Sequence, residues 1–304
     1  MSFVHKPVLS SEVIEHLAVN DPETYVDLTS GGGGHAELIL NKYPGIKAIL
    51  IDRDSDAVDH LKEKFKNMKN VTAVKSEAGN LDKVMFLLKI RSADIILADL
   101  GVSSHQFDTA SRGFSMKQDG PMDMRMDNGS GVTALEYIRS VTETELKNIL
   151  SEYAQERESL RVAKALKNAV ENGAMTTIEF ADAIKKAKKF VPKGIDAATQ
   201  VFMALRMAVN DEVGELEKLL KKSFSCLSER GKMGIITFHS TEDRIVKRFF
   251  RERKEGLPYY IESKTVTSSD VKVYKPFVPT EEEVKINHRA RSAKLRILEK
   301  NGNK

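Results

Sequence analysis

Residues 25–36 read Tyr25-Val26-Asp27-Leu28-Thr29-Ser30-Gly31-Gly32-Gly33-Gly34-His35-Ala36, which predicts a buried strand, a glycine-rich turn and the start of a helix. Glycines at such a turn let the backbone bend tightly and bring its N–H groups close to a ligand at the helix N-terminus. Gly31, Gly33 and Ala36 fit the dinucleotide pattern G-x-G-x-x-A, and Asp52 follows the next apolar run at the expected distance of about 20 residues. A carboxylate there accepts hydrogen bonds from the hydroxyl groups of an adenosine ribose. This order of features favours an adenosine cofactor over an ordinary glycine-rich turn beside a surface Asp.

The first third of the chain alternates short apolar runs with amphipathic stretches. Strands are predicted at residues 25–28, 48–51, 71–74 and 94–100, with helices between them at residues 36–43, 55–68 and 81–88. Nearly continuous apolar strands that alternate with helices are typical of a parallel sheet covered on both faces. The pattern returns near the end of the chain, with helices at residues 212–227 and 242–253 and a fifth strand at residues 234–238. Residues 271–274 and 293–298 alternate apolar and polar side chains, which predicts an antiparallel hairpin at the sheet edge.

Between residues 132 and 210 nothing resembles a strand. Helices are predicted at residues 134–139, 143–153, 157–172, 178–187 and 197–209, with Thr142 and Thr176 at N-cap positions. We therefore expect an α/β fold, with a Rossmann-like sheet domain formed by residues 1–112 and 211–304. Residues 113–210 would form an inserted loop plus an all-α domain that recognises the substrate.

The stretch Asp99–Asp127 follows an apolar run and shows neither helical nor strand periodicity. A compact domain seldom tolerates so long an irregular segment unless it serves as a lid or binding loop. Phe107, Phe114 and four methionines make it too apolar for a solvated linker. We expect a functional loop that closes over the substrate where the fourth strand ends.

The composition is that of a globular protein without a membrane segment. Among 304 residues, 41% are hydrophobic and 30% are charged, and no apolar span is long enough to cross a bilayer. The first residues lack the apolar segment of a secretory signal peptide, and Cys226 is the only cysteine. A cytoplasmic location is therefore expected. A single cysteine excludes an intramolecular disulfide and a cysteine-based zinc cluster, and the seven scattered histidines give no support for a metal site.

The charge is nearly balanced, with 48 Lys and Arg against 44 Asp and Glu. The basic residues nevertheless gather in three groups, which are Lys185, Lys186, Lys188, Lys189 and Lys193; Arg244, Lys247, Arg248, Arg251, Arg253 and Lys254; and Arg289, Arg291, Lys294 and Arg296. Such groups can contact nucleic-acid phosphates, or they can be solvated helix faces.

Two adenosine cofactors fit the strand, loop and helix, because NAD and S-adenosylmethionine use the same arrangement and the same acidic residue. Asp27 precedes the loop in D-x-T-x-G-x-G, close to the acidic pattern of methyltransferases, with Thr29 in place of the first glycine. Asp99 ends the fourth predicted strand, where methyltransferases that act on amino groups place a polar residue. These two features favour S-adenosylmethionine.

Longer motifs then extend the comparison to the whole chain. They are Asp27–His35, Ile51–Asp54, Asp99–Ser104, Arg112–Ser115, Asp119–Asp127, Phe238–Lys247 and Asn287–Ser292. With these motifs the sequence resembles the ribosomal RNA small subunit methyltransferase H family, which methylates the N4 amine of a cytidine in small-subunit (16S) rRNA. The resemblance implies a methyltransferase domain with a helical insertion, S-adenosylmethionine as cofactor, and small-subunit rRNA within the 30S subunit as partner.

Carried over position by position, the resemblance implies cofactor contacts at Gly33, Gly34, His35, Asp52, Ala78, Asp99 and Gln106. Relatives often carry an aromatic residue at the position of Ala78, so this chain departs from the pattern there. Asp99 is also the candidate catalytic residue, as an acceptor for a hydrogen of the target amine, although a purely cofactor-binding role is equally compatible. The chain has Asp99-Leu100-Gly101-Val102 where many amino methyltransferases have Asp/Asn-Pro-Pro-Tyr/Phe, so an aromatic that stacks the target base would come from elsewhere.

Further candidates for substrate binding are Phe114, Asp123, Arg125, Asp127, His239 and Arg244. Phe107 and Phe238 are alternative stacking residues. Each has a structural alternative: a phenylalanine can belong to the core, the charged residues of the loop can organise it, and His239 can be a satisfied structural histidine. Asp243 and Arg244 could form a local ion pair at a helix start.

Three other functions stay open at this point. An NAD-dependent oxidoreductase is supported by Gly31, Gly33, Ala36 and Asp52, and cofactor binding would separate it. A non-catalytic RNA-binding or assembly factor predicts no methyl transfer. A small-molecule methyltransferase is disfavoured by the basic groups and the helical insertion.

Overall fold

The structure is a computed structural model that describes residues 7–191, 196–261, 264–266 and 271–302. The chain forms two compact units, of which the first is Met1–Gly101 with Val213–Lys304 and the second is Val102–Glu212. The predicted sheet domain included residues 102–112, which belong to the second unit. Lys193, one of the predicted basic residues, lies outside the described residues. Within those residues, no helix combines the length and apolar character needed to cross a membrane.

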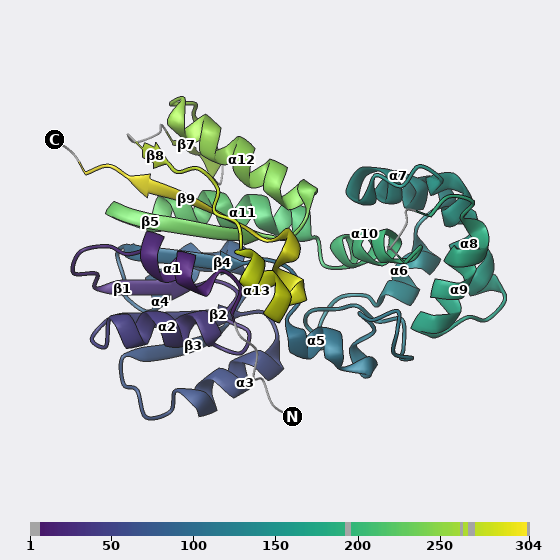
Figure 1. Cartoon of the computed structure of the whole chain (residues 1–304), viewed down its shortest axis with the longest axis horizontal. Helices are drawn as coiled ribbons and strands as arrows, with labels where there is room; N and C mark the ends of the chain where they lie inside the picture. The colour runs from purple at the N-terminus through teal and green to yellow at the C-terminus, as the bar shows by residue number, and fades with distance from the viewer. Residues whose placement is uncertain (1–6, 192–195, 262–263, 267–270, 303–304) are drawn as a thin grey trace. The chain divides into compact units, whose positions relative to one another are not determined.

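A seven-stranded sheet forms the centre of the first unit (Figure 1). In spatial order its strands are β3 (Val71–Lys75), β2 (Lys47–Asp52), β1 (Thr24–Asp27), β4 (Ala93–Asp99), β5 (Leu227–Thr237), β9 (Lys294–Lys300) and β8 (Val271–Val273). The first five strands pair in parallel, and β9 runs antiparallel to both β5 and β8. The predicted parallel sheet and the antiparallel pair at its edge are confirmed. A separate two-stranded pair joins β6 (Tyr259–Ile261) and β7 (Lys264–Val266).

Alternate residues of the central strands enter two hydrophobic cores, which explains why these strands are apolar on both faces. Val26 and Ile49 belong to the core that holds α4 (Leu81–Leu87), α11 (Glu212–Cys226) and α12 (Ser240–Lys254). Tyr25 and Leu50 belong to the opposite core, with α1 (Ser10–His16), α2 (Gly34–Lys42) and α3 (Ser55–Lys64). The sheet is therefore covered by helices on both faces.

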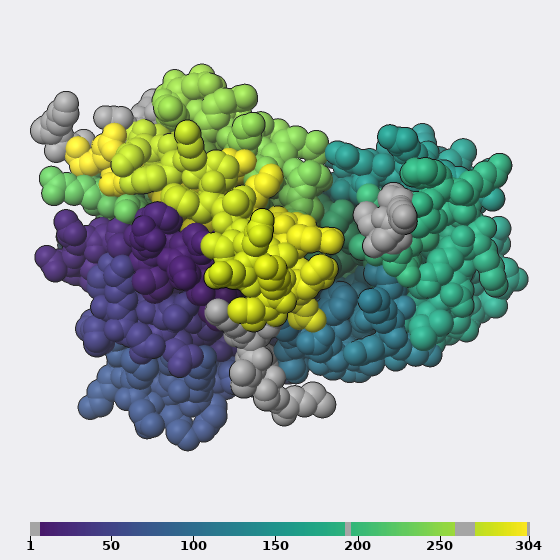
Figure 2. All heavy atoms as spheres, viewed as in Figure 1, coloured from purple at the N-terminus to yellow at the C-terminus, as the bar shows by residue number. Residues whose placement is uncertain are grey.

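Residues from the two ends of the chain lie side by side on the first unit (Figure 2). The backbone N–H of Leu9 donates to the carboxylate of Glu283, in α13 (Glu281–Ile286), at 2.7 Å. The His16 ring stacks on Phe277 with 3.9 Å between ring centroids. These contacts attach α1 to the segment that leads into β9.

The first half of β5 was not predicted as a strand. The strand begins at Leu227 rather than at residue 234, and Gly231 lies within it instead of before it. The pairing of β5 with β4 shifts its register between Ala93 and Ile95, and Arg230 has a φ of +63°. This irregular portion is polar and partly exposed, so it lacks the apolar pattern by which a strand is predicted.

The described residues of the second unit form six α-helices. They are α5 (Ser104–Asp108), α6 (Ala134–Ser140), α7 (Glu143–Ala154), α8 (Ser159–Glu171), α9 (Thr177–Ala187) and α10 (Thr199–Val209). The five predicted helices are confirmed within a few residues, and Thr142 caps α7 in a capping box with Glu145. Their apolar faces share one core, which includes Leu146, Leu166 and Phe180.

The stretch Asp99–Asp127 is more ordered than its sequence predicts. It contains α5 and a short 3-10 turn (Ala110–Arg112), and Met122, Met124 and Met126 are buried in the core of the second unit. Asn210 holds this segment, because its side chain accepts from the N–H of Met126 and donates to the carbonyl of Met124, both at 2.8 Å. From Val102 onward this segment therefore packs as part of the second unit, and its closure over the substrate stays a prediction.

Candidate active site

Three aspartates end three neighbouring parallel strands of the first unit. Asp52 is the last residue of β2, Asp27 of β1 and Asp99 of β4, and these strands are adjacent in the sheet. The carboxyl ends of parallel strands form the edge at which open α/β sheets bind ligands. The structure thus brings the predicted residues Asp52 and Asp99 to one edge, with the strand of Asp27 between them. Ala78 begins the short turn (Ala78–Asn80) that follows the neighbouring strand β3.

The glycine-rich loop turns tightly before α2. Gly33 is the N-cap of this helix with a φ of +72°, and Gly34 and His35 are its first residues. A Cβ atom on Gly33 would lie 2.8 Å from side-chain carbons of both Leu61 and Phe65. Glycine is therefore required at this position by the backbone conformation and by the close approach of α3.

Asp52 joins the end of β2 to the glycine-rich loop. Its carboxylate accepts hydrogen bonds from the N–H of Gly31 at 2.8 Å and from the N–H of Asp54 at 2.9 Å. Burial raises the pKa of Asp52 to about 6, although both hydrogen bonds act in the opposite direction. The predicted strand, loop, helix and carboxylate are thus physically connected.

Asp27 is the most enclosed of the three carboxyl groups, with 2% of its surface exposed. It accepts hydrogen bonds from the hydroxyl of Tyr25 at 3.0 Å and from the N–H of Thr29 at 3.2 Å. Burial raises the pKa of Asp27 to about 7, and these hydrogen bonds only partly offset the effect.

Asp99 has one carboxylate oxygen without a partner. Its Oδ1 is buried and accepts no hydrogen bond among the described residues, while its Oδ2 lies 3.7 Å from Nδ1 of His35. The backbone N–H of Asp99 donates to Oγ1 of Thr29 at 2.6 Å. Burial, followed by the charges of Asp27 and Glu242, raises the pKa of Asp99 well above its ordinary value. A buried acceptor without a hydrogen-bond donor costs free energy. A donor group on a ligand would therefore form a favourable hydrogen bond with this oxygen.

His35 faces Asp99 as a neutral ring. Its Nε2 lies 2.8 Å from the carbonyl oxygen of Val8, so we assign the proton to Nε2. Burial lowers the pKa of His35 to about 4, which keeps the ring neutral near neutral pH. The lone pair of Nδ1 is then directed toward Asp99.

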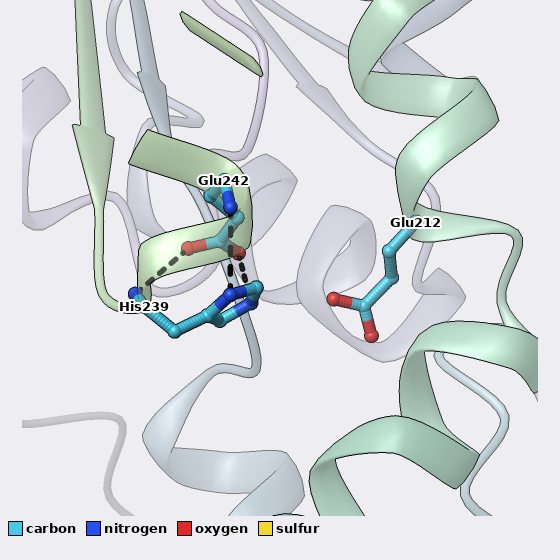
Figure 3. A group of neighbouring side chains, drawn as sticks. All are labelled: Glu212, His239 and Glu242. Atoms are coloured by element: carbon cyan, nitrogen blue, oxygen red, sulfur yellow. Dashed lines mark hydrogen bonds and ion pairs between the residues drawn. The ribbon is translucent and has the colours of Figure 1, made fainter. Parts of the chain in front are cut away.

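His239 and Glu242 form the start of α12, directly after β5 (Figure 3). The carboxylate of Glu242 accepts from the backbone N–H of Phe238 at 2.9 Å and lies 3.1 Å from Nε2 of His239. His239 was predicted as a substrate-binding candidate, and these contacts are those of a helix-capping residue. Glu242 adds a fourth carboxyl group whose charge acts on Asp99.

Two predicted site residues of the second unit are buried within it. Gln106 is 5% exposed, and its side chain accepts from the N–H of Ser103 and donates to the carbonyl of Met126. Phe114 is also 5% exposed and belongs to the hydrophobic core of this unit. The burial of Phe114 agrees with the packing alternative.

The charged residues that alternate with the buried methionines have local partners. Arg125 and Asp123 form a two-pronged ion pair, in which both nitrogen–oxygen distances are 2.8 Å. Asp127 accepts from the N–H of Gly129 at 3.0 Å and from the hydroxyl of Ser130 at 3.1 Å. Both arrangements agree with the alternative that these residues organise the loop.

The sequence left open a local ion pair between Asp243 and Arg244. Asp243 instead binds Arg296 at 2.7 Å and Lys294 at 3.2 Å, both on β9, because α12 packs beside that strand. Arg244 is exposed on α12.

Several members of the predicted basic groups are internal rather than on the surface. Lys188 is buried against Glu156 at 2.5 Å, and Arg253 is 1% exposed. Lys294 and Arg296 are paired with Asp243, as described above. The three predicted basic groups therefore cannot contact phosphates with all of their residues.

Thr29 and Glu242 belong to this edge and were not predicted as site residues. The spacing His239-x-x-Glu242 could have indicated a capping carboxylate at the start of α12. The sequence does not indicate the contact of Thr29 in the same way, because its partner Asp99 is 70 residues away along the chain.

Comparisons with known proteins agree over nearly the whole chain. A model of the MraW methylase family matches residues 2–301. A protein of Coprothermobacter proteolyticus called ribosomal RNA small subunit methyltransferase H is 40% identical over 298 residues, covering 97% of this chain and 96% of that protein. A protein of the same name from Carboxydothermus hydrogenoformans is 40% identical over 312 residues, covering 99% of each chain. Among solved structures, an rRNA methylase from Streptococcus thermophilus has a TM-score of 0.43 and 10% identity, over 96% of this chain and 95% of that chain.

Proposed function

This chain belongs to the MraW methylase family, and we propose that it transfers the methyl group of S-adenosylmethionine to the N4 amine of a cytidine in small-subunit (16S) rRNA. The observation that carries the site assignment is the row of Asp52, Asp27 and Asp99, with the unbonded oxygen of Asp99 at its end. We further infer that the RNA is methylated within the 30S subunit, which would place the reaction in the cytoplasm.

The row of carboxyl groups suits a positively charged cofactor. Burial raises the pKa values of Asp27, Asp52 and Asp99, so each carboxylate would be stabilised by a nearby cation. The sulfonium of S-adenosylmethionine is such a cation, whereas the pyrophosphate of NAD would bring further negative charge to the edge. The residues proposed to hold the cofactor are Gly33, Gly34, His35, Asp52, Ala78 and Asp99 of the first unit, and the contact implied for Gln106 stays a prediction.

When bound, S-adenosylmethionine supplies an activated methyl group on a positively charged sulfur. The N4 amine of cytosine is a poor nucleophile, because its lone pair is delocalised into the ring. Asp99 would accept a hydrogen bond from this amine through Oδ1, which favours a pyramidal nitrogen as charge develops. The amine must also lose one proton when it is methylated, and Asp99 would receive that proton.

Thr29 and His35 prepare Asp99 for this role. The hydrogen bond from the Asp99 N–H to Thr29 fixes the end of β4 against the glycine-rich loop. The neutral ring of His35 offers only a lone pair to the Asp99 carboxyl group, so it places no competing donor there. Preorganisation of this kind contributes to catalysis without a cost at the moment of reaction.

Mass mapping of small-subunit rRNA tests this function. RNA from cells without the protein should lack one methyl group on a cytidine, and purified protein with S-adenosylmethionine should restore it to isolated subunits. A methyl group on a ring carbon or on a ribose would contradict the N4 assignment. Restoration on naked rRNA but not on subunits would contradict the assembled substrate.

A further inference from the structure

A hollow of about 480 Å³ on the second unit is lined mainly by cations. It lies between α7, α8 and the segment that precedes α8. Its lining residues are Lys147, Arg157, Glu158, Ser159, Leu160, Arg161 and Lys164, and we call this surface the basic hollow. Arg157, Arg161 and Lys164 fall at intervals of four and three residues, which places them on one side of α8 and its approach.

The cations of the basic hollow are not balanced by acidic neighbours. Glu158 is the only acidic residue of the lining, and its carboxylate lies 3.6 Å from Arg161. The same carboxylate accepts hydrogen bonds from the N–H groups of Lys189 at 2.9 Å and Phe190 at 3.1 Å. These donors partly stabilise its negative charge, so less of that charge offsets the cations. Within the described part of the chain, Lys147, Arg157 and Lys164 form no ion pair. The surplus positive charge favours an anion.

An exposed phenylalanine is joined through its backbone to Glu158, a residue of the basic hollow. Phe190 is 65% exposed, although a phenylalanine gains free energy when it is buried. Glu158 accepts a hydrogen bond from the backbone N–H of Phe190 and pairs with Arg161, so one carboxylate connects Phe190 to a cation of the basic hollow. Cationic surfaces beside aromatic rings are typical of sites for single-stranded nucleic acid, where phosphates meet the cations and bases stack on the rings.

We propose that the basic hollow and Phe190 bind a single-stranded segment of the substrate rRNA. Lys147, Arg157, Arg161 and Lys164 contact its phosphates, and Phe190 stacks on one base. This inference rests on the proposed function, since it is the RNA substrate that supplies the phosphates and the base. The site would position the RNA through the helical unit, whereas the sheet unit supplies the chemistry.

The test measures the affinity of the full-length protein for a fluorescent single-stranded oligoribonucleotide at several salt concentrations. The variant R157Q/R161Q should bind more weakly, and its log–log salt slope should fall by about 1.4, because each phosphate contact on a single strand contributes about 0.7. The matched control K62Q/K66Q removes the same charge from lysines that pair with Asp59 and Glu63 on and just after α3, and it should keep the wild-type slope. R157K/R161K should also keep it.

Phe190 is tested separately from charge. F190A should lower the affinity about tenfold, within the range for a base stacked on an aromatic ring, and should leave the salt slope unchanged. F190W should retain the affinity. An unchanged circular dichroism spectrum and an unchanged urea midpoint show that each variant is folded.

Two results would contradict the RNA site, and a third would contradict the proposed function. Wild-type affinity and slope in both R157Q/R161Q and F190A would overturn the RNA site. Normal RNA binding with lost methylation of isolated subunits would also overturn it, because the hollow would then serve a protein partner. Loss of RNA binding in the variants, with no methyl transfer by the wild type, would support the RNA site and contradict the proposed function.

Discussion

Replacing Asp27 with Asn should remove a large part of the pH dependence of this protein's stability. Asp27 is 2% exposed, and burial raises its pKa to about 7 from an ordinary value of 3.8. An acid whose pKa is higher in the folded state stabilises the fold fully below its unfolded pKa, and this contribution is lost as the pH rises through the folded value. A difference of about three pKa units corresponds to about 4 kcal/mol. The wild type should lose about this much stability between about pH 4 and pH 8 through Asp27 alone.

The Asp27→Asn amide is neutral at every pH and has nearly the same shape. It can still accept from the N–H of Thr29, while the hydroxyl of Tyr25 can change from donor to acceptor. Urea unfolding of both proteins at intervals across this pH range gives the difference in their free energies of unfolding. The wild type should become less stable relative to the variant as the pH rises. A difference that does not vary with pH would show that burial does not raise the pKa of this carboxyl group.

Three more predictions concern the cofactor, the catalytic carboxylate and the second unit. Because burial raises the pKa of Asp52 to about 6, S-adenosylmethionine should bind about fourfold more tightly near pH 7.5 than near pH 5.5 in calorimetry, and equal affinities would contradict the role of its ionised form. Thr29→Val leaves the N–H of Asp99 without its acceptor and should lower single-turnover methyl transfer about tenfold with little change in cofactor affinity. Thr29→Ser keeps the hydroxyl and should restore the rate. If Thr29→Ser were as slow as Thr29→Val, the hydrogen bond to Asp99 would not be what supports the rate. Asn210→Ala removes the partner of the Met126 N–H and should lower the free energy of unfolding by about 2 kcal/mol in urea, whereas a loss under about 0.5 kcal/mol would show that the loop is held by other contacts.

The cofactor edge could be predicted from the sequence because its signals are local. The residues from Tyr25 to Ala36 carry the strand, the turn and the helix start within one segment, and Asp52 follows at the end of the next strand. The raised pKa of Asp27 could not be predicted in the same way. It depends on burial, which is set by helices and strands far away along the chain.

The second unit shows the limits of periodicity as a signal. Met122, Met124 and Met126 alternate with charged residues and are buried, yet no neighbouring strand runs beside them along their length, so the segment matched neither standard pattern. Its order depends on Asn210, a residue more than 80 positions away.

Basic residues illustrate the same point for the surface. Lys188 and Arg253 lie in conspicuous basic runs and are buried. The basic hollow combines Lys147 of α7 with Arg161 and Lys164 of α8 and with Arg157 just before α8, and these residues form no conspicuous run. Only packing decides which of these cations meet solvent.

The role of Asp99 is tested by single-turnover methyl transfer with the variant Asp99→Asn, measured together with its affinity for S-adenosylmethionine. The amide keeps the size of the side chain but cannot take up a proton from the amine. We expect the rate on small-subunit rRNA to fall at least a hundredfold, as is typical when a general base is lost, while the cofactor affinity changes about threefold or less. A rate close to that of the wild type would contradict the assignment of Asp99, and so would a loss of activity explained entirely by weaker cofactor binding.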